Sequence, residues 1–77
     1  MLRERIRTII ATELEVPVES VPIGASADTF AAWDSLGHMK IIVAVEEQLA
    51  VRFNTAEIPE LTSIDKLVVA LEKKGIT

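Results

Sequence analysis

Apolar residues recur at helical spacing in three separate stretches of this chain, and this periodicity constrains its fold most strongly. The first stretch predicts a helix of about 13 residues, with an apolar face made of Leu2, Ile6, Ile9, Ile10 and Leu14. The second predicts a helix from Asp34 or Ser35 to about Leu49. The third predicts a helix with one face made of Ile64, Leu67, Val68 and Leu71. No alternating, strand-like pattern competes with this interpretation, so we expect an all-α fold.

A long segment without helical periodicity, residues 15–33, separates the first two helices. Pro17, Pro22 and Gly24 interrupt it, which is typical of a loop. Long loops in small domains are commonly functional or are held by their own apolar side chains. We expect the anchors to be Val16, Val18, Val21, Ile23 and Phe30.

A short fourth helix is predicted near the C-terminal end. Asn54 to Glu57 has the pattern of a capped helical turn, and Pro59 is expected to cut it off. Thr62 followed by Asp65 predicts the N-cap of the last helix, and Gly75 is placed to close it. The expected architecture is therefore a bundle of three long helices and one short helix, with a long loop between helices one and two.

Length and composition limit the classes of protein that this chain can represent. A chain of 77 residues is expected to form a single domain, residues 1–77. It has no cysteine, so disulfides and thiolate metal sites are excluded, and we expect a cytoplasmic location. The longest unbroken apolar run, Ile41 to Val45, is too short to span a bilayer, and we expect no secretory signal in the N-terminal segment.

Charge is distributed unevenly along the chain, whose formal net charge is −4. No lysine or arginine lies between Thr8 and Met39, whereas five acidic residues do. An acidic surface argues against nucleic acid and favours basic protein partners. An ordinary solvated surface of a monomer explains the same pattern, and both interpretations stay open.

Ser35 is the strongest candidate functional residue, because it stands at the predicted start of a helix between Asp34 and Leu36. A helix start has unpaired backbone N–H groups and the positive end of the helix dipole, so it suits a phosphate ester. A simple helix cap is the alternative. A serine nucleophile assisted by His38 is disfavoured, since no orienting carboxylate, oxyanion hole or nucleophile elbow accompanies it. As the only histidine, His38 is expected on the surface and not as a metal ligand.

The second helix is apolar on more than half of its circumference, which indicates a core position, a partner surface or both. We interpret Leu36 and Met39 as a docking strip, with Val43 at its edge and with Glu46 and Glu47 as its charged rim. Each apolar residue taken alone also fits a plain core position.

The run Asp34-Ser35-Leu36-Gly37-His38-Met39 resembles the attachment motif of acyl carrier proteins. The likeness extends over essentially the whole chain. It includes the predicted helix order, Val43-Ala44-Val45-Glu46-Glu47 within the second helix, and Leu61-Thr62-Ser63-Ile64 before the last. The resemblance implies that Ser35 carries 4′-phosphopantetheine, donated by coenzyme A through a phosphopantetheinyl transferase.

The same resemblance implies a non-enzymatic carrier without a metal site, which holds acyl or aminoacyl groups as thioesters for partner enzymes of fatty acid, polyketide or related biosynthesis. Asp34 would orient the transferase reaction, and Leu36 and Met39 would contact the transferase and the acyl-processing enzymes. A small helical adaptor without a prosthetic group is the competing hypothesis.

Three positions depart from the usual pattern of fatty-acid carriers, which have further acidic residues where this chain has Gly37, His38 and Lys40. Together with Trp33 before the motif, these departures favour a specialised, secondary-metabolite, aminoacyl or peptidyl carrier. Gly37 also has a low helix propensity, about 1 kcal/mol below alanine, which predicts a loose helix start.

Overall fold

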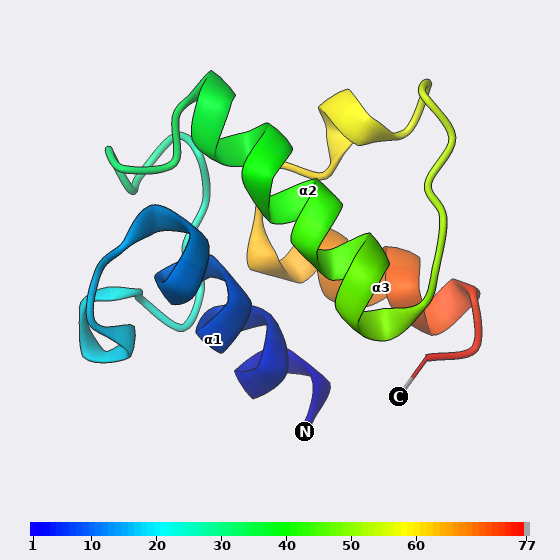
Figure 1. Ribbon diagram of the computed structural model, residues 1–77, viewed down its shortest axis with the longest axis horizontal. Coiled ribbons are helices and arrows are strands. Elements are labelled where there is room, and N and C mark those ends of the chain that lie inside the picture. Colours follow the sequence, from blue (N-terminus) through cyan, green and yellow to red (C-terminus); the bar gives the residue numbers. More distant parts are fainter. Residues whose placement is uncertain (77) are drawn as a thin grey trace.

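The computed structural model describes residues 1–76, in which the regular elements are helices and no strand is formed. Three α-helices, α1 (Leu2–Leu14), α2 (Ser35–Leu49) and α3 (Ile64–Lys73), are joined by segments that contain the short 3₁₀ helices η1 (Val18–Ser20) and η2 (Ile58–Glu60) (Figure 1). The expected all-α class and the long loop between α1 and α2 are confirmed. No helix within residues 1–76 is long and apolar enough to cross a membrane.

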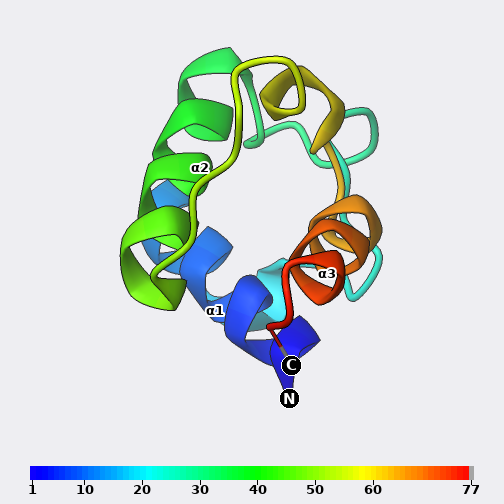
Figure 2. The same ribbon diagram turned by 90° about the vertical axis from the view of Figure 1, so that its right-hand side faces the viewer.

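The three α-helices surround a common core, with α1 packed against both α2 and α3 (Figure 2). Every member of this core is apolar, and no polar or charged residue of the described chain is fully buried. Ten side chains are almost completely inaccessible: Trp33, Ile6, Ile10, Ile41, Ile42, Ile64, Leu67, Leu71, Val21 and Val45. Aliphatic packing therefore supplies the stability that a cysteine-free chain needs.

The helix ends follow standard capping chemistry, with one correction to the sequence prediction. Ser63, and not Thr62, caps α3, because its hydroxyl accepts the Lys66 N–H at 3.1 Å. At the other end Gly75 has φ +87°, and the Ile76 N–H donates to the carbonyl of Leu71 at 3.0 Å. Gly75 thus closes the helix as predicted, in the arrangement that favours glycine.

The predicted short helix occurs in a different form. Asn54 and Glu57 cap each other, since the backbone N–H of each donates to the side chain of the other at 2.9 Å. The chain then continues into η2, which contains Pro59 near its first turn. Pro59 is therefore the second residue of the 3₁₀ helix and does not cut a helix off, because proline lacks only an N–H that a helix start leaves unpaired.

Arginines of α1 hold the long loop, and the sequence did not identify them as anchors. Arg7 donates to the carbonyl oxygens of Val18 and Val21 at 2.7–3.1 Å, and Arg3 donates to that of Ile23 at 3.1 Å. Among the expected apolar anchors, Val21 is buried, whereas Ile23 is 63% exposed. The loop is thus held by charged side chains that bind its backbone carbonyls, in addition to its own apolar residues.

Candidate functional site

Ser35 is the first residue of α2, and its side chain is exposed. Asp34 is the N-cap of this helix, because its Oδ1 accepts the backbone N–H of Gly37 at 2.8 Å. The backbone N–H of His38 donates to the Asp34 carbonyl at 2.7 Å and begins the regular helix. The cap is therefore Asp34, which leaves the Ser35 hydroxyl out of the helix hydrogen bonds.

The start of α2 is favourable for a negatively charged group. Within residues 1–76 no acceptor is found for the backbone N–H groups of Ser35 and Leu36. Unpaired N–H groups and the positive end of the helix dipole meet at this point. An ester of phosphoric acid on Ser35 would lie next to both, although the Asp34 carboxylate opposes part of this attraction.

A cleft of about 450 Å³ opens beside Ser35. Trp33, Ser35 and Met39 line it from the α2 side, and Ile58, Pro59 and Thr62 line it from the side of η2. We call this hollow the site cleft. Its lining is mostly apolar, so it suits the uncharged part of a flexible arm attached to Ser35.

His38 joins the two sides of the site cleft. Its Nδ1 accepts the indole N–H of Trp33 at 3.0 Å, and its Nε2 lies 2.9 Å from the carbonyl oxygen of Ile58. Because an indole only donates and a carbonyl only accepts, the ring is the neutral form with its hydrogen on Nε2. The two rings also stack, with centroids 6.1 Å apart.

The structure therefore corrects the prediction that His38 is a free surface side chain. It is half-buried, and both of its nitrogens are engaged within the protein. A histidine that serves as a general base for Ser35 needs a ring nitrogen free to accept the serine proton. His38 has none, so the arrangement gives no support to a serine hydrolase.

The docking strip, Leu36, Met39 and Val43, lies on the outside of α2. These side chains are 67%, 47% and 47% exposed, whereas Ile41, Ile42 and Val45 of the same helix are buried. The helix therefore has one apolar face in the core and another in solvent. Exposed apolar strips of this kind are typical of interaction surfaces, and docking at this one stays a prediction.

The two glutamates assigned to the rim of the strip lie in different places. Glu47 lines a shallow groove together with Met39, Val43 and Lys40. Glu46 is half-buried, and its Oε2 accepts the backbone N–H of Phe53 at 2.9 Å. Glu46 therefore fixes the segment after α2, and Glu47 is the acidic residue beside the strip.

The sequence did not identify the η2 side of the site. Ile58 and Pro59 reach the cleft from more than twenty positions beyond Ser35, and no local pattern signals their approach. A pairing of Trp33 with His38 was detectable in principle, since the two flank the capping turn. Among the described residues, no cluster of three or more potential metal ligands exists.

Comparison with known proteins agrees with this geometry. Residues 4–71 match the family described as "Phosphopantetheine attachment site". Acyl carrier protein 3 of Ralstonia nicotianae is 33% identical over 69 residues, which cover 90% of this chain and 79% of that protein. The chain belongs to the acyl carrier protein family. The acyl carrier protein of Buchnera aphidicola is 27% identical over 75 residues, covering 97% of this chain and 94% of the relative.

Membership of the acyl carrier protein family determines the general biochemistry. Its members are carriers and not enzymes, they bear a covalently attached 4′-phosphopantetheine, and they interact with biosynthetic enzymes. The exposed hydroxyl at the start of α2 and the apolar site cleft beside it fit such a group.

Proposed function

We propose that this acyl carrier protein bears 4′-phosphopantetheine on Ser35 and carries acyl or aminoacyl groups as thioesters on its terminal thiol. The observation that supports the assignment is the position of Ser35, exposed at the first residue of α2 and beside the site cleft. The sequence contains no cysteine, so the thiol has to come from the prosthetic group.

Attachment requires only that the Ser35 hydroxyl reach a transferase. In this step Ser35 Oγ bonds to the phosphorus of the phosphopantetheinyl group of coenzyme A. The bond to 3′,5′-adenosine bisphosphate breaks, and the serine proton passes to a base of the transferase. His38 does not act as this base, because both of its nitrogens are engaged.

Partner recognition is assigned to the start and outer face of α2. Asp34 and the docking strip surround Ser35, so an enzyme that binds the strip places its active site near the prosthetic group. Lys40 and Glu47 line the same groove as Met39. A cation in this place differs from the acidic pattern of fatty-acid carriers and favours a partner set from specialised biosynthesis.

The modification is tested by intact mass after incubation with coenzyme A, magnesium ion and a broad-specificity phosphopantetheinyl transferase. We expect one phosphopantetheinyl addition to the wild-type protein and none to S35A. Ser63 is a natural comparison, because its hydroxyl is already used to cap α3. Addition to S35A, or a peptide map that places the group on Ser20, Ser26 or Ser63, would overturn the assignment.

The adaptor hypothesis makes a different prediction from the same two sites. An adaptor works through the docking strip alone, so S35A would keep partner binding and activity while M39E would lose both. With a carrier, either change abolishes the activity of the pathway that it serves. Unimpaired activity of S35A in cell extract or in a reconstituted pathway would favour the adaptor.

A further inference from the structure

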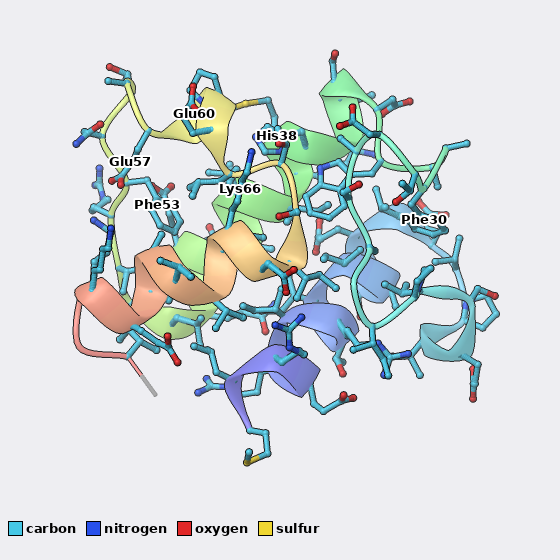
Figure 3. All side chains as sticks on the ribbon, turned by 180° about the vertical axis from the view of Figure 1, so that it is seen from behind. Phe30, His38, Phe53, Glu57, Glu60 and Lys66 are labelled. Carbon is cyan, nitrogen blue, oxygen red and sulfur yellow. The ribbon has the colours of Figure 1, made fainter. Side chains whose placement is uncertain are left out.

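Trp33 and His38 form the inner wall of the site cleft. Trp33 is 2% exposed and His38 is half-buried, whereas Ser35, Met39 and Pro59 on the same cleft are exposed. Figure 3 shows His38 where α2 approaches η2. Its hydrogen bonds to Trp33 and to the Ile58 carbonyl, which we call the His38 bridge, tie together the segment before α2, the first turn of α2 and η2.

The His38 bridge lies between the exposed lining of the site cleft and the buried residues of α2. His38 shares a helix face with Ile41, Ile42 and Val45, which follow it by three, four and seven residues. These three side chains are at most 1% exposed. A chain that moved inward from the cleft along this face would first have to pass between the His38 ring and Ile58, which a 2.9 Å hydrogen bond joins.

Opening this route carries a specific cost. Separation of His38 from η2 would leave the Ile58 carbonyl without its donor, and a rotated ring would leave the indole N–H of Trp33 without an acceptor. Because the indole is only 2% exposed, loss of this acceptor leaves its N–H poorly solvated. The bridge therefore resists entry of an alkyl chain more strongly than apolar packing alone does.

We propose that the His38 bridge selects the cargo of this carrier by confining a group held on the Ser35 arm to the site cleft. The inference rests on the proposed function. The cargo class that fits is a short or polar acyl group, which gains little from burial. A long alkyl chain would gain the most free energy from burial in the core, and the bridge prevents this burial.

The test compares wild type, H38A and T62A, each loaded on Ser35 with butanoyl or dodecanoyl groups. Loading uses amide-linked acyl-coenzyme A analogues, which do not hydrolyse, and a broad-specificity transferase. Thr62 is the matched control, because it lines the same cleft but takes no part in the bridge or in the docking strip. If the wild type does not load, the proposed function is wrong and this inference fails with it. If the wild type loads, the later measurements test the His38 bridge alone.

The readouts are the methyl NMR signals of Ile42 and Val45 and the thermal midpoint. In wild type and T62A we expect these signals to be the same for both cargoes. In H38A the dodecanoyl form should shift them and should melt several degrees above the butanoyl form. Shifts of the core signals in dodecanoyl wild type, or equal behaviour of both cargoes in H38A, would overturn the proposal.

A purely structural role of His38 gives a different result. It would lower the thermal midpoint of H38A by the same amount with either cargo. If H38A does not fold, H38L replaces it, because leucine fills a similar space but can neither donate to the Ile58 carbonyl nor accept from Trp33. We expect the dodecanoyl shift in H38L as well, and its absence would contradict the proposal.

Discussion

The start of α2 packs so closely on the end of α1 that a Cβ on Gly37 would lie 2.7 Å from Leu14 Cδ2. The same Cβ would lie 3.1 Å from Asp34 Oδ1 and 3.2 Å from the carbonyl oxygen of Ala32. Helix propensity alone predicts that Gly37 loosens the helix start. The structure shows another reason for glycine here, since a Cβ would crowd Leu14, the capping carboxylate and a backbone carbonyl at once.

We therefore expect G37A to destabilise the protein by about 1 kcal/mol, although alanine is the better helix former. Overpacking costs roughly 1–3 kcal/mol, and the higher helix propensity of alanine offsets about 1 kcal/mol of this. Urea denaturation measures the difference. G24A is the control, because a Cβ there meets nothing within 4 Å, and we expect it to be neutral or slightly stabilising. A G37A protein as stable as wild type would show that the Leu14 side chain moves aside without a measurable cost.

The loop between α1 and α2 should depend on Arg7. Its guanidinium donates to the carbonyls of Val18 and Val21 and retains only 16% side-chain exposure. Hydrogen bonds from a charged donor contribute roughly 1.5–3 kcal/mol, so R7A should lower the free energy of unfolding by about 2 kcal/mol. Arg5 is exposed on the same helix and provides the control, with R5A expected within about 0.5 kcal/mol of wild type. Equal effects of the two substitutions would contradict this role.

Much of this fold follows from local sequence patterns. The bounds of α1 and α2, the closing glycine of α3 and the mutual capping of Asn54 and Glu57 are set by periodicity and by side chains within four residues of one another. Such interactions need no knowledge of the rest of the chain. The position of Ser35 at the start of α2 also follows from a local pattern, since the residue that precedes it is the helix cap.

The features that the sequence did not predict depend on contacts between distant segments. Arg7 appeared as a polar residue off the apolar face of α1, but its partners lie up to fourteen residues away. The sequence pattern predicts His38 as a surface residue. It does not reveal the acceptor of this side chain, the Ile58 carbonyl, which lies twenty residues further along. Every residue has a backbone carbonyl, so a sequence pattern does not show which one a distant side chain binds. Anchors of this kind are identified only in the folded chain.

The charge and the capping role of Asp34 can be separated. D34N retains an oxygen that accepts the Gly37 N–H, so its stability should stay within about 0.5 kcal/mol of wild type. D34A loses the cap and should cost about 1 kcal/mol. If the carboxylate orients the transferase reaction, both variants should load phosphopantetheine on the order of tenfold more slowly, the equivalent of about 1.4 kcal/mol. Normal loading of D34N together with slow loading of D34A would assign Asp34 to capping alone.

Glu57 should make stability dependent on pH. Its pKa is lowered because the Asn54 backbone N–H donates to its carboxylate and because Lys74 donates to it as well. A lowered carboxyl pKa in the folded state means that the stabilisation is complete above the ordinary value of 4.5 and is lost as the pH falls through the folded value. E57Q should therefore be less stable than wild type at pH 7, and the difference should shrink towards pH 3. Urea midpoints at the two pH values measure it, and a constant difference would contradict the linkage.

Docking through the outer face of α2 is tested best with two valines that are equally exposed. Val43 lies in the docking strip and is 47% exposed, and Val69 lies on α3 and is 49% exposed. Glutamate at either position should change stability by no more than about 0.5 kcal/mol, as is usual for surface substitutions. V43E places a charge inside the contact that Leu36 and Met39 begin, so it should slow transferase loading about tenfold or more, whereas V69E should load like wild type. Loading rates at fixed carrier and transferase concentrations measure the difference. Equal slowing by both variants would indicate a general effect of added negative charge, and normal loading of V43E would move the docking surface away from this strip.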